Sequence, residues 1–121
     1  DFQEVNKSYE DYFYRKKIIK IMCNQLNIKC LFLIHPVFHT TNGLGSKNDI
    51  LVAEYIQKHY PNHKKIVDEG YKILRKDIDI IDLSKIYDGK QNIFFDEAHT
   101  NKIGSEVMGK EIYDIISKNI F

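Results

Sequence analysis

Apolar side chains recur at helical spacing along the first part of the chain. They fall at Tyr9, Tyr12, Phe13, Ile18, Ile19, Met22 and Leu26. The basic residues Arg15, Lys16 and Lys17 lie between them. This pattern predicts a long amphipathic helix from about residue 8 to residue 26, whose aromatic residues from Tyr9 to Tyr14 belong to the core.

An unbroken apolar run, Cys30 to Ile34, follows this helix and ends before Pro36. Such a short continuous run is typical of a strand that is buried on both faces, as in a parallel sheet. The next segment, residues 37 to 49, contains turn-forming residues and two glycines. It predicts a long loop, and long loops in compact domains are often functional.

Helices and strands then alternate to the end of the chain. Helical spacing covers residues 49 to 60, stops at Pro61 and resumes from residue 66 to residue 74. The β-branched segment 77–84 predicts a second strand, and a short apolar stretch follows at 93–95. A regular helical stripe closes the chain, at Ile103, Val107, Met108, Ile112, Ile115 and Ile116. This order predicts an α/β fold with a parallel sheet and crossover helices.

Two or three strands are few for a parallel sheet, because its members need neighbours and cover on both faces. No linker-like composition divides the 121 residues. We therefore interpret residues 1–121 as one unit that forms part of a larger α/β domain.

The composition is ordinary for a soluble globular protein, with 43% hydrophobic and 29% charged residues. The formal net charge of +1 gives no net attraction toward nucleic acid or an anionic membrane, so we expect neither as a partner. No apolar run approaches 18 residues. The compartment stays open between the cytoplasm and the cell envelope.

The two cysteines, Cys23 and Cys30, do not match a zinc-ligand spacing. We interpret both as core residues, with a disulfide between them as the less favoured alternative.

The candidate chemistry lies in the segment "FFDEAHTNKIG", where Asp96 precedes His99 by three residues. A carboxylate at this spacing can hold one imidazole nitrogen and leave the other as an acceptor, which is what a general base for a serine hydroxyl requires. The structural alternative is that Asp96 stabilises the N-terminal end of the last helix.

The segment "IFFDEAHTNKIGSEVMGKEIYDII" resembles the last conserved block of the SGNH, or GDSL-type, hydrolases. In that family an apolar stretch precedes Asp-x-x-His, a glycine follows, and an amphipathic helix closes the domain. The matching residues are Asp96, His99 and Gly104. The resemblance implies a flavodoxin-like three-layer α/β/α fold with a parallel sheet, of which this chain would be the C-terminal portion. It also implies a serine esterase that needs no cofactor, with His99 as the base and Asp96 as its orienting acid.

The family's Gly-Asp-Ser nucleophile block is absent, because none of the five serines follows Gly-Asp. The family also has a Gly-x-Asn-Asp block whose groups donate to the oxyanion. The segment "SKND" at 46–49 has serine in place of the glycine and follows the strand that ends at Pro36, where that block does not lie, so we expect Asn48 or Asp49 to cap the next helix. We therefore expect the isolated chain to be inactive and to associate with a missing N-terminal segment or with itself. The substrate implied is a small-molecule or carbohydrate ester, such as an O-acetyl group. A non-catalytic α/β interaction module, or a degenerate hydrolase fragment, is the alternative.

Other histidines are weaker candidates. His35 and His39 follow the first strand, on the side where ligands bind in parallel α/β sheets, so they are candidates for a substrate-side loop. A zinc site built from His35, His39 and His99 is a less favoured alternative, and we assign no metal. His59 and His63 flank Pro61, which would break a helix between them, and we expect both at the surface.

Overall fold

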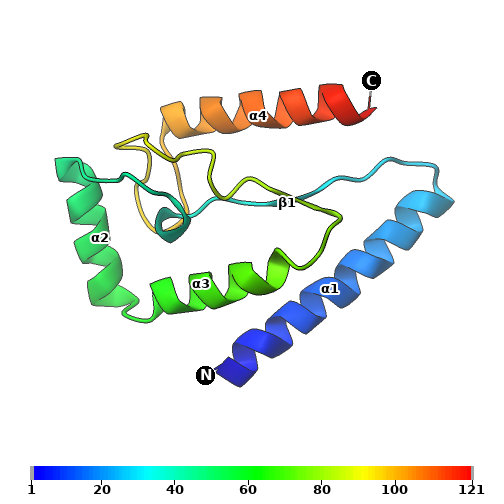
Figure 1. The fold of residues 1–121 in the computed structure, drawn as a ribbon, viewed down its shortest axis with the longest axis horizontal. Coiled ribbons are helices and arrows are strands. Elements are labelled where there is room, and N and C mark those ends of the chain that lie inside the picture. The colour runs from blue at the N-terminus through cyan, green and yellow to red at the C-terminus, as the bar shows by residue number, and fades with distance from the viewer. Residues whose placement is uncertain (1, 121) are drawn as a thin grey trace.

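The computed structural model describes residues 2–120, apart from the side chain of Phe2, and orders them as helices around a small sheet (Figure 1). The elements are α1 (Phe2–Gln25), β1 (Phe32–Ile34), the 3-10 helix η1 (Phe38–Thr40), α2 (Lys47–His59), α3 (His63–Leu74), β2 (Ile80–Asp82) and α4 (Lys102–Ile120). Within the described residues, no helix is both long and apolar enough to cross a membrane.

The two strands pair in parallel, with Phe32 opposite Ile80 and Ile34 opposite Asp82. The chain between them passes through η1, α2 and α3, so the connection is a helical crossover of the kind that parallel strands require. This pairing confirms an α/β fold. The apolar stretch at 93–95 forms no strand, and Phe94 makes only an isolated bridge with Thr100.

The prediction that the first strand is buried on both faces is wrong for the described chain. Ile34 is buried at 3% exposure, but Phe32 and Leu33 are only half-buried. The reason is that β1 has a single neighbouring strand, β2, within residues 2–120.

Two clusters of buried side chains form the core. One joins β1 to α3 and consists of Ile34, Val67 and Tyr71. The other joins η1, α2 and the segment before α4, and consists of Phe38, Val52, Ile56, Tyr87, Ile93 and Phe94. The second cluster anchors the segment that carries Asp96 and His99.

The start of α2 is a capping box built from Ser46 and Asp49. The Ser46 hydroxyl accepts a hydrogen bond from the Asp49 N–H at 3.1 Å, and the buried Asp49 carboxylate accepts one from the Ser46 N–H at 3.0 Å. The same carboxylate accepts a hydrogen bond from the N–H of Asn92 at 3.0 Å. Ser46 is thus the cap, in place of Asn48 or Asp49, and Asp49 ties α2 to the segment before the candidate site.

Helix α1 packs on α3 through a close contact between Tyr9 and Gly70. A Cβ on Gly70 would lie 1.7 Å from the Tyr9 hydroxyl oxygen, far closer than van der Waals contact, so any other residue here would displace the Tyr9 side chain. Beyond this contact the inner face of α1 is basic, because Lys16 is buried in an ion pair with Asp77 and Lys20 pairs with Asp79. The predicted apolar face is therefore wrong in its second half, where the residues exposed to solvent are Ile18, Ile19, Met22 and Leu26. The assignment of Tyr14 to the core is also wrong, because its side chain is 68% exposed.

Cys23 and Cys30 form a disulfide, with their Cα atoms 6.3 Å apart. The less favoured alternative, a disulfide, is therefore the correct one; Cys23 is buried in the core as predicted, whereas Cys30 is only half-buried. The bond joins the last turn of α1 to the segment that leads into β1.

Replacing both cysteines by serine should lower the free energy of unfolding by about 2–3 kcal/mol. This is the stabilisation expected when a disulfide between residues seven apart reduces the conformational entropy of the unfolded chain. Urea denaturation with and without dithiothreitol measures the effect, and the Cys23→Ser/Cys30→Ser variant is the control that should not respond to the reductant. An identical midpoint for the oxidised and reduced natural chain would contradict the expectation.

Candidate active site

The segment between Ile93 and Asn101 folds back on itself before α4 begins. The Asn101 N–H donates to the Ile93 carbonyl at 2.8 Å, and the Phe95 N–H donates to the His99 carbonyl at 2.9 Å. Ile93 and Phe94 are each 1% exposed and fix the base of this fold-back in the core. The tip, residues 95 to 99, is called the 95–99 turn below.

Both carboxylate oxygens of Asp96 are engaged within the 95–99 turn. Oδ1 accepts hydrogen bonds from the N–H groups of Ala98 at 2.9 Å and His99 at 2.7 Å, an arrangement in which an aspartate closes its own turn. Oδ2 lies 2.7 Å from Nδ1 of His99. Asp96 can close the turn and hold the imidazole at once because His99 is three residues away. When Oδ1 accepts the N–H groups of the turn, Oδ2 lies beside the imidazole of His99.

The exposure of the two side chains differs, at 80% for His99 and 30% for Asp96. Partial burial pushes the pKa of Asp96 up, but hydrogen bonds from the N–H groups of His99 and Ala98 and from the imidazole outweigh it and lower the pKa. The hydrogen bond to Asp96 raises the pKa of His99. The imidazole is thus neutral, and able to accept a proton, only above this raised pKa.

The carboxylate also selects the tautomer of the neutral imidazole. Because Asp96 accepts from Nδ1, the neutral ring carries its proton there and presents Nε2 as an acceptor. Among the described residues Nε2 has no hydrogen-bond partner, and the ring is open to solvent. This arrangement can take a proton from a hydroxyl group placed next to it.

The start of α4 packs tightly against the base of the turn. The Asn101 Oδ1 atom accepts a hydrogen bond from the Gly104 N–H at 3.0 Å, so Asn101, and not Asp96, caps this helix. A Cβ on Gly104 would lie 2.6 Å from the Thr100 Cβ and 2.8 Å from a methyl carbon of Ile93. Gly104 is therefore required for α4 to approach the segment that holds His99.

Gly104→Ala should lower the free energy of unfolding by about 1–3 kcal/mol, as overpacking of a tight contact does. Gly109→Ala is the matched control on the same helix, because a Cβ there meets nothing within 4 Å. That substitution should raise stability by about 0.5–1 kcal/mol through helix propensity. Urea denaturation compares the two, and equal shifts in the same direction would refute the packing role of Gly104.

The two other predicted histidines lie at the carboxyl end of β1, as expected. His35 is exposed, and its carbonyl accepts a hydrogen bond from the Tyr71 hydroxyl at 2.5 Å. His39 is half-buried in η1. Helix η1 lies against the 95–99 turn, because the Phe38 N–H donates to the Glu97 carbonyl at 2.9 Å.

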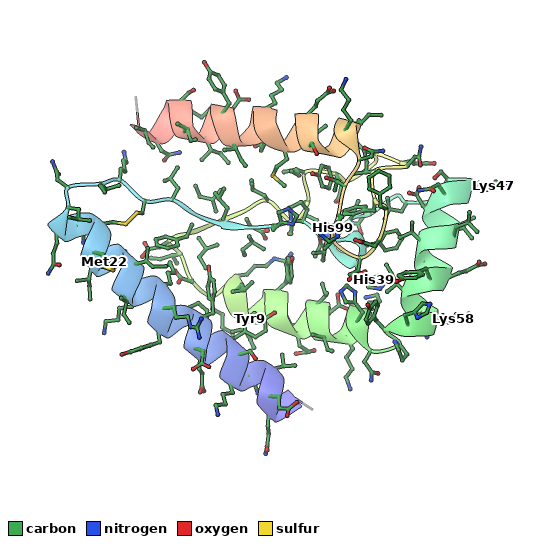
Figure 2. The ribbon with its side chains drawn as sticks, turned by 180° about the vertical axis from the view of Figure 1, so that it is seen from behind. Tyr9, Met22, His39, Lys47, Lys58 and His99 are labelled. Atoms are coloured by element: carbon green, nitrogen blue, oxygen red, sulfur yellow. A yellow bond between two sulfur atoms is a disulfide. The ribbon has the colours of Figure 1, made fainter. Side chains whose placement is uncertain are left out.

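The structure brings η1 and the 95–99 turn together, and Figure 2 shows His39 and His99 in the same region of the molecule. Within residues 2–120, however, no hydrogen bond or ring contact joins His35 or His39 to Asp96 or His99. Among the described residues, the candidate catalytic pair thus consists of Asp96 and His99 alone.

His63 was expected at the surface, and this expectation was wrong. It is the first residue of α3, its ring centre lies 5.2 Å from that of His39, and its Nδ1 is buried without a hydrogen-bond partner. Burial lowers the pKa of both histidines. The signal was available in the sequence, because His63 lies four residues before the buried Val67 and so on the same face of the helix. His59 stays exposed.

Two grooves meet at His39. One, of 630 Å³, runs between η1 and α3 and includes Val67 and Tyr71 in its lining. The other, of 380 Å³, lies between η1 and α2 and includes Phe38 and Leu44. The volumes of both grooves fall in the range of small-molecule sites. Both grooves lie next to η1, which contacts the 95–99 turn.

In the part of the chain that the structure describes, no group of three or more His, Cys, Asp or Glu side chains is placed to hold a metal ion. The zinc alternative built from His35, His39 and His99 therefore has no support in the geometry. Comparison of the chain with protein-family models, with curated proteins and with solved structures finds no match.

Proposed function

We propose that this chain carries the general base of a serine ester hydrolase of the SGNH type. The observation that supports the proposal most is the 2.7 Å contact between Asp96 Oδ2 and His99 Nδ1, which leaves Nε2 as an acceptor open to solvent. The resemblance of the segment around Asp96, His99 and Gly104 to the last block of that family adds to it.

In the proposed reaction, His99 Nε2 removes the proton of a serine hydroxyl as the serine oxygen attacks the ester carbonyl. The Asp96 carboxylate stabilises the imidazolium that forms. The imidazolium then donates this proton to the leaving alkoxide, and an acyl-serine remains. Water completes the cycle: His99 takes its proton, hydroxide adds to the acyl carbonyl, and the proton returns to the serine oxygen.

The nucleophilic serine and the oxyanion donors would come from a polypeptide segment outside these 121 residues. Among the described residues no serine is hydrogen-bonded to His99; the serines are Ser8, Ser46, Ser84, Ser105 and Ser117. Ser46 caps α2, and Ser84 is fully buried beside Arg75. The chain alone is therefore inactive in this proposal.

The same proposal places β1 and β2 in the second half of a flavodoxin-like parallel sheet, with residues 1–121 as the C-terminal portion of one three-layer domain. The half-buried Phe32 and Leu33 support it, since a further strand and covering helices would bury them. The substrate is a small acyl ester or an O-acetyl group on a carbohydrate, with His35 and His39 on its side of the site. No cofactor takes part.

One observation favours the alternative, a non-catalytic α/β interaction module or a degenerate hydrolase fragment. Asp96 closes the 95–99 turn through two backbone hydrogen bonds, a structural role that needs no reaction. The two functions differ in what His99 does, since its 80% exposed ring contributes little to the packing of the turn.

Ester hydrolysis by a longer polypeptide separates the two functions. Joining this chain to an upstream segment with a strand that ends in Gly-Asp-Ser should produce hydrolysis of p-nitrophenyl acetate. Residues 1–121 alone, and the longer polypeptide with its serine replaced by alanine, are the inactive controls. A folded longer polypeptide without serine-dependent hydrolysis would favour the non-catalytic module.

A further inference from the structure

The second half of α1 turns its apolar side chains to solvent. Tyr14, Ile18 and Ile21 follow one another at steps of four and three residues, so they form one stripe along the helix, and Met22 lies beside Ile18. Leu26 and Ile28 continue the stripe into the segment after the helix. These six side chains, called the outer face below, are 41% to 68% exposed.

The opposite side of the same helix half is occupied by charges. Lys16, 6% exposed, pairs with Asp77 at 2.6 Å, and Lys20 pairs with Asp79. These ion pairs orient the helix, because rotating α1 to bury Ile18 would pull the ammonium of Lys16 away from its carboxylate. The outer face is thus a fixed apolar surface, and a contiguous apolar patch of this kind marks a binding surface.

Basic residues border the outer face. At 100° per residue, Arg15 and Lys17 lie on opposite flanks of the stripe, Glu10 and Asp11 lie at its N-terminal end, and all four are exposed. Between residues 12 and 46 the chain contains five basic residues and no Asp or Glu. Lys16 and Lys20 are paired with Asp77 and Asp79, and the exposed cations are Arg15, Lys17 and Lys29. The net charge of +1 conceals this separation of charge along the chain.

We propose that the outer face of α1 docks on an anionic lipid bilayer. An apolar stripe bordered by Lys and Arg matches the interface of such a bilayer, where apolar side chains enter the acyl boundary and the cations meet the headgroups. The helix lies in the plane of the surface. A second copy of the chain is a poorer partner, since pairing two outer faces brings Arg15, Lys17 and Lys29 of each copy close to those of the other.

The position of the helix suits this role. Figure 1 shows the C-terminal half of α1 at the edge of the molecule, at the opposite end of its long axis from the segment before α4. Docking through the outer face therefore leaves the 95–99 turn open to the aqueous side. The inference uses neither Asp96 nor His99, so it stands independently of the proposed esterase.

The chain contains no tryptophan, so a single introduced tryptophan reports its own surroundings. Met22→Trp, on the outer face, should shift its emission to the blue with vesicles of phosphatidylglycerol and phosphatidylcholine in equal parts. The shift should weaken with added salt and be absent with phosphatidylcholine alone. Tyr113→Trp, at a 69% exposed position on α4, is the control that should bind the same vesicles without a shift.

Charge reversal tests the flanking cations in the chain without tryptophan. Arg15→Glu/Lys17→Glu should lose most of its co-sedimentation with the anionic vesicles, whereas the matched reversal Lys47→Glu/Lys58→Glu on α2 should keep it. Three results would overturn the proposal. They are co-sedimentation of the natural chain with neither vesicle, equal binding to both, or a concentration-dependent emission shift of the Met22→Trp variant without vesicles, which would mean a second copy.

Discussion

His99→Ala should remove nearly all ester hydrolysis by the polypeptide that joins this chain to its nucleophile segment, with a loss of about four to six orders of magnitude in kcat. The reason is that alanine leaves the serine hydroxyl without an acceptor for its proton, and no other described side chain is hydrogen-bonded near Nε2. The fold should persist, because the His99 ring is 80% exposed. The measurement is the rate of p-nitrophenyl acetate hydrolysis at saturating substrate.

His59→Ala is the matched control, since His59 is an exposed histidine at the end of α2. It should leave kcat and KM unchanged. For His99→Ala, a rise in KM with kcat unchanged would assign the residue to substrate binding, and no change in either constant would remove it from the site altogether.

Asp96→Asn should reduce kcat by about three to four orders of magnitude. The asparagine oxygen can still accept the N–H groups of Ala98 and His99, so the turn survives. Its amide nitrogen, however, would donate to Nδ1 and place the ring proton on Nε2, which removes the acceptor. Circular dichroism checks the fold, and initial rates measure the loss.

The pH profile provides a second readout of the same substitution. The carboxylate raises the pKa of His99, so activity of the natural protein rises with pH through that raised pKa. In Asp96→Asn the pKa of His99 falls, and the acid limb of the residual kcat/KM should move to lower pH. An acid limb at the same pH for both proteins would mean that Asp96 does not raise the pKa of His99.

The ion pair also links stability to pH. The folded pKa of Asp96 is lowered, so its contribution is present above the ordinary aspartate pKa and is lost as the pH falls through the lowered value. The folded pKa of His99 is raised, so its contribution is full below the ordinary histidine pKa and is lost as the pH rises through the raised value. The pair therefore stabilises the turn in the window between these two titrations.

The spacing of apolar residues predicted helices α2, α3 and α4. The stripe of α4, the break at Pro61 between α2 and α3, and the parallel pairing of β1 with β2 all follow from local pattern and chain order. The 95–99 turn was also within reach, because Asp96 closes it through neighbours two and three residues away.

The orientation of α1 depends on contacts that are distant in sequence. Tyr9 lies on its inner side, whereas the exposed isoleucines of its second half lie on the outer side, and Lys16 takes the inner position opposite Asp77. Periodicity within one helix cannot contain this information. The disulfide between Cys23 and Cys30 was only the less favoured alternative, and the contact of His63 with His39 was not predicted, since each depends on where a turn returns the chain.

The central claim is that Asp96 makes His99 a base whose free acceptor is Nε2. The most direct measurement is a ¹⁵N NMR titration of the imidazole nitrogens in residues 1–121, with the natural chain and Asp96→Asn side by side. The account predicts a neutral ring protonated on Nδ1, with a pKa above the ordinary histidine value of about 6.5 that falls in Asp96→Asn. A ring protonated on Nε2, or a pKa that ignores the substitution at Asp96, would contradict it.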